Sequence, residues 1–190
     1  MRTKILRNLA LFIIGLVMSN NNLFSQVVSD TPSYFNATIH FPSELNAKVL
    51  TREASYAYFE REYTNHMEDI SLNVTMYVER AEDDMFMYLA NEYKDIVASL
   101  TRRGCQISYK TFNKEKKVFM ISWTANGIGR YLKCHLRGNA LYSWTLSWDK
   151  TDSETHRRAK AYIDNRQIYY TWRDIACLGV SAHCLLADNS

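Results

Sequence analysis

The chain has 190 residues, of which 47% are apolar and 23% charged, with only 6 Gly and 2 Pro. This composition excludes a collagen-like chain and a disordered chain rich in Pro and Gly. A chain of this length forms one domain and buries enough surface to fold without a metal or a disulfide.

The N-terminal segment has the layout of a secretory signal peptide. Three basic residues within the first seven precede an apolar run, Leu9–Met18, and a polar stretch, Ser19–Asn22, follows it. The run is about half of the roughly 20 residues that a membrane-spanning helix needs. We therefore expect residues 1–26 to be a signal peptide that is removed on export, with an uncleaved anchor as the alternative.

Export changes the charge balance of the chain. The formal net charge of +3 comes from 23 basic and 20 acidic residues, and three of the basic ones lie before position 27. The exported chain is therefore formally neutral. Because nucleic-acid binding depends on excess positive charge, we expect no nucleic-acid partner.

The first elements of the domain follow from the period of the apolar residues. Alternation from Ile70 to Val78 predicts a strand with one buried face. Apolar residues then recur at helical spacing from Met85 to Leu100, and Gly104 supplies a stop, which predicts a helix over about 83–103. Two earlier strands are expected at about 35–41 and 54–63.

Two hairpin turns organise the second half of the chain. Asn126–Gly127 and Gly138–Asn139 are turn sequences that join neighbouring strands. We expect strands at about 105–112, 117–125, 130–137 and 140–148, followed by a helix that begins near Thr151 or Ser153 and continues to Trp172.

The predicted order is βββ-α-ββββ-α. This order indicates an α+β domain over residues 27–172, with a single antiparallel sheet of about six or seven strands and helices packed on it. Residues 173–190 form a C-terminal tail.

The last three strands can be aligned through their turns. A two-residue loop at Gly138–Asn139 sets Arg137 opposite Ala140, so that His135 faces Tyr142 and Lys133 faces Trp144 on one side of the sheet. The other side is apolar and belongs to the core. The first face is aromatic and basic, and its candidate binding residues are Tyr131, Lys133, His135, Tyr142 and Trp144.

This aromatic and basic face has two interpretations. In the first, which we favour because aromatic stripes usually belong to the core, the C-terminal helix covers it. In the second, part of it stays open and binds a flat, anionic or sugar-like ligand. The second interpretation requires that Tyr142 and Trp144 are not fully covered.

The four cysteines divide into two pairs. Cys177 and Cys184 lie close enough in the tail to close a small disulfide loop. Cys105 and Cys134 lie on strands that a third strand separates, about 9.5 Å apart, whereas a disulfide needs Cα atoms within about 7 Å. We expect the second pair to be free thiols.

The sequence contains no catalytic, cofactor or metal motif that we could identify. The histidines are scattered, and Cys134 and His135, as neighbours on a strand, point to opposite faces. Cys177, His183 and Cys184 are too few and too crowded for a closed zinc site. We therefore expect no catalytic residues, no cofactor and no metal.

The chain resembles the PsbP-like superfamily in its order of elements. The resemblance rests on Phe35–Pro42 as an opening strand and Gly129–Lys133 in a late hairpin, and it spans about residues 33–172. That superfamily includes the photosystem II protein PsbP, a Ran-binding import factor and many small exported bacterial proteins. The resemblance implies a three-layer α/β/α domain that acts by binding, and it assigns no functional residue.

The sequence thus favours an exported, periplasmic or extracellular, non-enzymatic binding or accessory protein. Its partner is an unknown protein or small molecule, with no stable membrane span after cleavage. One alternative is an envelope-assembly protein that forms oligomers through the aromatic face or the apolar segment 175–186. The other is a hydrolase, which a pocket that gathers His135, Tyr142 and an acidic residue would favour.

Overall fold

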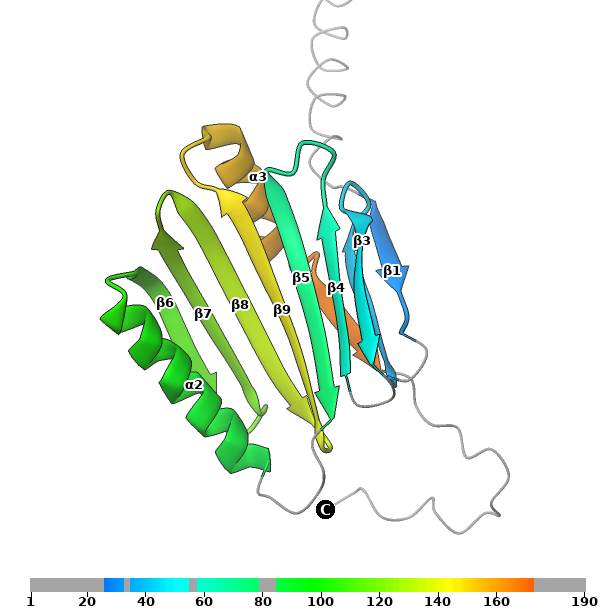
Figure 1. Ribbon diagram of the computed structural model, residues 1–190, viewed down its shortest axis with the longest axis vertical. Helices are drawn as coiled ribbons and strands as arrows, with labels where there is room; N and C mark the ends of the chain where they lie inside the picture. The colour runs from blue at the N-terminus through cyan, green and yellow to red at the C-terminus, as the bar shows by residue number, and fades with distance from the viewer. Residues whose placement is uncertain (1–25, 33–34, 55–57, 79–84, 173–190) are drawn as a thin grey trace, which may run out of the picture.

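The computed structural model describes residues 26–32, 35–54, 58–78 and 85–172 (Figure 1). The predicted signal peptide, apart from its last residue, lies outside the described residues. So does the predicted tail, with Cys177 and Cys184.

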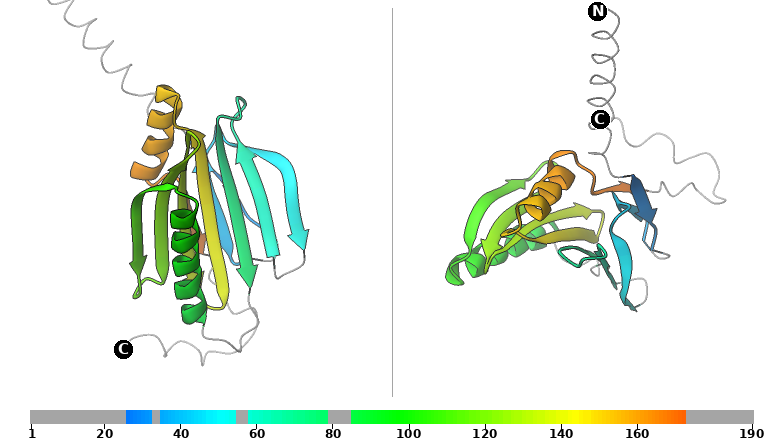
Figure 2. Two further views of the ribbon diagram at one scale, coloured as in Figure 1. Left: turned by 60° about the vertical axis from the view of Figure 1, so that its left-hand side comes forward. Right: turned by 90° about the horizontal axis from the view of Figure 1, so that it is seen from above.

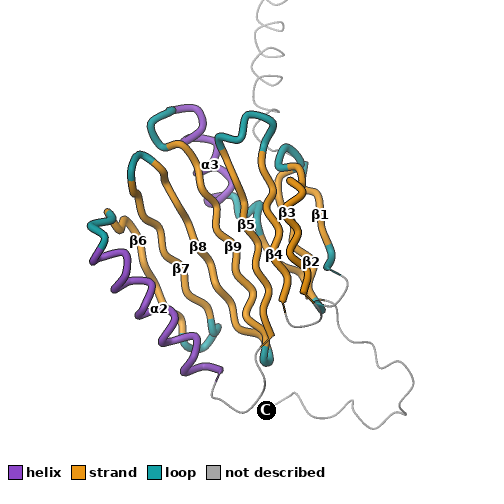
Figure 3. The backbone as a smooth tube through the Cα atoms, in the orientation of Figure 1, coloured by secondary structure: helices purple, strands orange, loops and turns teal. Residues whose placement is uncertain are grey.

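The main sheet has seven strands, and every neighbouring pair is antiparallel. Figure 3 shows the strands side by side. The strands of the second half of the chain lie next to one another in chain order at one end of this sheet, as predicted. In sheet order, the strands are β3 (Asn46–Ala54), β4 (Tyr58–Thr64), β5 (Ile70–Val78), β9 (Ala140–Asp149), β8 (Ile128–Arg137), β7 (Val118–Ala125) and β6 (Gln106–Asn113).

A second, three-stranded sheet corrects the prediction of a single sheet. It consists of β1 (Val27–Asp30), β2 (Ala37–Pro42) and β10 (Tyr169–Trp172), with β2 in the middle. The expected opening strand is therefore β2, and it does not join the main sheet. Its alternate residues Ala37, Ile39 and Phe41 are buried in one cluster with the core side chains of β5 and β9, so β2 packs on that sheet face to face.

The helix α2 (Met85–Arg102) confirms the predicted first helix. Leu89 and Leu100 are buried in a cluster with Phe119 and Ile121 of β7, and Tyr93 packs its ring on Phe119 at 5.5 Å. This cluster is the apolar side of the sheet that alternation predicted. We call the side of the main sheet that carries α2 the α2 face.

The helix α3 (Ser153–Asp164) lies on the opposite side, which we call the α3 face (Figure 2). The small sheet occupies the same layer, so the molecule has the three layers expected of an α/β/α domain. Asp152 caps the helix by accepting a hydrogen bond from the Thr155 backbone N–H at 2.7 Å.

The second predicted helix is correct at its start and wrong at its end. The chain leaves the helix at Asn165, and Tyr169–Trp172 forms β10, which pairs with β2. In this segment Ile168, Tyr170 and Trp172 are the more buried residues, whereas Tyr169 and Thr171 are exposed. That alternation suits a strand, and the free edge of β2 supplies the hydrogen bonds.

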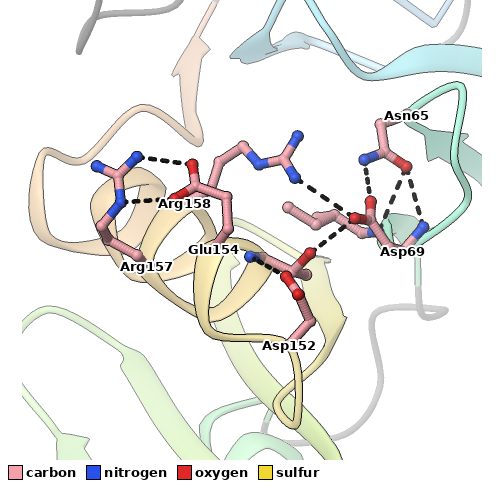
Figure 4. A network of polar contacts seen from close by, with 8 residues as sticks. Asn65, Asp69, Asp152, Glu154, Arg157 and Arg158 are labelled. Carbon is pink, nitrogen blue, oxygen red and sulfur yellow. Dashed lines mark hydrogen bonds and ion pairs between the residues drawn. The ribbon is translucent and has the colours of Figure 1, made fainter.

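A polar network fixes the start of α3 to the β4–β5 turn (Figure 4). The Asp69 carboxylate accepts hydrogen bonds from the Thr155 hydroxyl at 2.7 Å and from the Asn65 side-chain amide, and it pairs with Arg158 at 3.4 Å. Because Thr155 and Asn65 are buried, this network is a buried polar link between the start of α3 and the β4–β5 turn.

The predicted strand register is confirmed. In the β8–β9 hairpin, Arg137 lies opposite Ala140, His135 opposite Tyr142, and Lys133 opposite Trp144. Cys105 and Cys134 are free, as predicted, with β7 between β8 and β6.

Candidate functional site

The structure brings the five predicted binding residues together. Tyr131, Lys133 and His135 of β8 lie beside Tyr142 and Trp144 of β9, all on the α3 face. Tyr142 and Trp144 are only 5% and 3% exposed, however. The requirement that these two rings stay open is therefore not met, and of the five predicted residues only those of β8 can contribute to a ligand surface on this face.

The cover over these rings is not the one predicted from the sequence. Trp172 and Tyr170 of β10 approach the Tyr142 ring, with centroids at 4.6 and 5.7 Å, and Phe35 approaches it at 6.3 Å. Trp144 stacks on Tyr131 at 5.3 Å. The interpretation that the face is covered is thus correct for β9, but β10 and the segment before β2 supply much of the cover instead of an extended helix.

Next to the covered region, a groove of about 530 Å³ opens between α3 and the β6–β7–β8 end of the sheet. This volume lies in the range of small-molecule sites. We call it the α3 groove. Its lining combines aromatic rings, hydroxyls and charged side chains: Tyr109, Tyr131, Trp148, His156, Ser108, Ser122, Thr124, Lys150, Lys160 and Asp164.

Trp148 and His156 form a fixed wall of the α3 groove. The Trp148 indole N–H donates a hydrogen bond to His156 Nδ1 at 3.0 Å, and the two rings stack at 20°. Gly129 makes room for this arrangement, because a Cβ at that position would lie 2.4 Å from the Trp148 ring. With Nδ1 accepting, a neutral His156 carries its proton on Nε2 and can donate from there.

Hydroxyl groups and lysines line the other side. The Ser108 and Ser122 hydroxyls lie 3.2 Å apart, and Lys150 Nζ donates to the Thr124 hydroxyl at 3.0 Å. Lys160 is paired with Asp164 at 3.6 Å in an exposed contact.

The phenol of Tyr131 stays neutral in this setting. Burial, and to a smaller extent the nearby Tyr109, raise the pKa of Tyr131 to about 12. Its hydroxyl is therefore a hydrogen-bond donor and acceptor near neutral pH, so the α3 groove is a polar concave surface with ring faces and many hydrogen-bonding groups.

A row of cations continues along β8 from the α3 groove. Lys133, His135 and Arg137 alternate on the α3 face, and the Arg137 guanidinium lies 4.6 Å from the Trp172 ring centroid. Burial and the nearby Arg166 lower the pKa of Lys133. Burial and the charges of Lys133 and Arg137 lower the pKa of His135.

Sequence reasoning missed most residues of the α3 groove. Trp148 continues the alternation of Tyr142 and Trp144 and could have been added from the pattern alone. His156, Lys160 and Asp164 belong to α3. The position of that helix on the sheet depends on long-range contacts such as the Asp69 network, for which the sequence carries no signal.

The arrangement expected of a hydrolase is not found in the part of the chain that the structure describes. The charged groups acting on His135 are cations, and Cys134 faces the opposite side of the sheet. Burial and Glu92 raise the pKa of the Cys134 thiol to about 12, which keeps it protonated. Within residues 26–32, 35–54, 58–78 and 85–172, no three His, Cys, Asp or Glu side chains gather as metal ligands.

A helix that crosses a membrane must be both long and apolar. Neither α2 nor α3 is long and apolar enough to cross a bilayer.

Comparison with solved structures identifies the architecture. The solution structure of cyanobacterial PsbP from Synechocystis is similar over 78% of this chain and 94% of that chain, with a TM-score of 0.54 and 5% identity. The chain has the PsbP-like fold. The resemblance inferred from the sequence is thereby confirmed at the level of the fold.

A second solved structure is also similar to this chain. A point mutant of the protein Mog1 is similar over 79% of this chain and 97% of that chain, with a TM-score of 0.47 and 12% identity. No family model matches the chain, and neither does any curated protein.

Proposed function

We propose that this chain is an exported, non-enzymatic binding protein of PsbP-like type that holds a small, sugar-like or otherwise ring-shaped polar ligand in the α3 groove. The PsbP-like fold fits an accessory binding protein. Export is supported by the layout of the N-terminal segment.

The observation that carries the proposal is the composition of the α3 groove. Tyr109, which is 48% exposed, Tyr131 and His156 present ring surfaces to a concave volume of about 530 Å³. Ring faces contact the apolar side of a sugar or another flat ring, while surrounding hydroxyls hydrogen-bond its polar edge. Trp148 and Gly129 hold the His156 wall in place before any ligand arrives, which lowers the ordering cost of binding.

Binding, not catalysis, is the function that these groups support. His156 is engaged with an indole N–H and not with a carboxylate, and the lysine beside Asp164 is exposed and paired. A general acid or base normally faces a group that sets its pKa and orients it toward the reacting atoms.

The test uses the chain from residue 27 onward and a panel of neutral mono- and disaccharides, measured by saturation-transfer NMR. Tyr109→Ala removes an exposed ring from the α3 groove and should weaken binding at least about fivefold, since stacked rings contribute about 1–3 kcal/mol. The matched control is Tyr88→Ala, which removes a 38% exposed tyrosine from α2 on the other side of the sheet.

Binding to the wild type that Tyr88→Ala preserves and Tyr109→Ala weakens supports the proposal. If no member of the panel binds, the sugar-like ligand is refuted. If the two variants lose binding equally, the α3 groove is not the ligand site. The amide spectrum of each variant shows whether it has kept its fold.

A further inference from the structure

The cation row on β8, which consists of Lys133, His135 and Arg137, lies beside the α3 groove and does not line it. Lys133, His135 and Arg137 alternate on one side of the strand, so successive members lie about 6.6 Å apart. Arg166 follows the α3 C-cap Asn165, and after burial its charge is the second cause that lowers the pKa of Lys133. None of these four side chains forms an ion pair with any described residue.

The surroundings of the row hold its members in place. Lys133 is half-buried between its strand neighbours Met120 and Trp144. The Trp172 ring meets His135 edge-on at 5.3 Å and lies under the Arg137 guanidinium. Like charges that lie close together against apolar side chains, partly removed from water, repel one another, and a bound anion would offset that repulsion.

The position of the row connects it to the α3 groove. Tyr131 lines the groove, and Lys133 is the next residue on the same side of the same strand. On the other flank, Ile163 and Asp164 line the groove, and Arg166 follows them in the chain. A ligand in the α3 groove can therefore extend along β8 toward Lys133.

We propose that Lys133, His135, Arg137 and Arg166 form an oxyanion subsite that binds a phosphate, sulfate or carboxylate group of the ligand held in the α3 groove. The identity of the ligand's ring portion rests on the proposed function, whereas the oxyanion subsite is tested independently. Arginine offers a planar pair of donors to an oxyanion, and lysine and protonated histidine add single charge-assisted hydrogen bonds.

Anion binding at this subsite takes up a proton. His135 is faced by Lys133 and Arg137 from its own strand, by Tyr142 from β9, by Val118 from β7 and by Trp172 from β10. Both charged neighbours are cations, so His135 is mainly neutral above its lowered pKa. A bound oxyanion favours its charged form, and affinity therefore rises as the pH falls through the His135 pKa.

The experiment is an NMR titration of the ¹⁵N-labelled chain from residue 27 onward with sulfate, which keeps its charge over the pH range used. Sodium chloride holds the ionic strength constant, and acetate replaces sulfate in a second arm to separate tetrahedral oxyanions from carboxylates. We expect saturable shifts at Lys133, His135 and Arg137, with a dissociation constant on the order of 10 mM, and affinity severalfold higher at pH 5.5 than at pH 7.5.

Three variants test the assignment. Lys133→Met keeps the apolar stem and removes the charge, and it should weaken sulfate binding about tenfold. Arg166→Asn alters an exposed turn residue with φ of 53°, which Asn tolerates, and it should weaken binding in the same direction without disturbing the fold. His135→Gln should remove most of the pH dependence.

The control is Lys94→Met, which removes an exposed lysine from α2 on the opposite side of the sheet. The oxyanion subsite is refuted if the wild type shows no saturable shift, or if Lys94→Met weakens sulfate binding as much as Lys133→Met. Binding of a neutral saccharide without sulfate binding refutes the subsite alone. Sulfate binding that depends on Lys133, without any saccharide binding, refutes only the sugar-like ligand.

Discussion

The Asp69 carboxylate links the start of α3 to the β4–β5 turn, and its removal tests how much this link contributes to stability. Asp69→Ala removes the acceptor for the Thr155 hydroxyl and for the Asn65 side-chain amide, and it breaks the pair with Arg158. The hydrogen bond from the backbone N–H of residue 69 to the side-chain oxygen Oδ1 of Asn65 survives the substitution. The change therefore isolates the side-chain contribution of Asp69 to the network shown in Figure 4.

The expected loss of stability follows from burial. Thr155 and Asn65 are 1% and 2% exposed, and a buried donor left without its acceptor costs about 1–3 kcal/mol. The pair with Arg158 is about a quarter exposed on both sides and adds less than about 1 kcal/mol. We expect a total of about 3–4 kcal/mol, which lowers the Tm by about 6–15 °C for a domain of this size.

The free energy of unfolding is measured by urea titration followed by circular dichroism and tryptophan fluorescence. The control is Arg157→Ala, which breaks the ion pair with Glu154 on the same helix. That pair is more than half exposed on both sides, so its loss should leave the free energy of unfolding almost unchanged. A cost below about 1 kcal/mol for Asp69→Ala, or equal costs for the two variants, would show that the network does not hold α3 on the sheet.

Three further results are expected. Burial tends to raise the pKa of Asp69, but Asn65, Thr155 and Arg158 together hold it below its usual value of 3.8. The contribution of ionised Asp69 to the stability of the fold is therefore complete above that value. In acid urea titrations, the difference in unfolding free energy between wild type and Asp69→Ala should shrink as the pH falls through the lowered pKa. Gly129→Ala should cost about 1–3 kcal/mol and shift the Trp148 indole N–H resonance, because the new Cβ displaces the ring from His156; an unchanged resonance would contradict this. A thiol reagent should label half-exposed Cys105 in the native protein and buried Cys134 only after unfolding, with both labelled in denaturant as the reference, and equal native rates would oppose the observed packing.

The sequence alone determined those parts of this protein that depend on residues close to one another in the chain. The period of the apolar residues set β5 and α2, and the two hairpin turns set the register of β7, β8 and β9. Because side chains alternate along a strand, that register also decided which residues share the α3 face. Tyr131, Lys133 and His135 could therefore be grouped before any tertiary structure was considered.

Tertiary contacts decided what covers that face and where it stays open. Residues 168–172 carry aromatic side chains that suit either a helix or a strand, and only the free edge of β2 selects the strand β10. In that strand, Tyr170 and Trp172 cover the Tyr142 ring. Likewise, α3 borders the α3 groove because tertiary contacts such as the Thr155–Asp69 hydrogen bond hold it on the sheet. A hydrogen bond between residues 86 positions apart leaves no periodic pattern in the sequence.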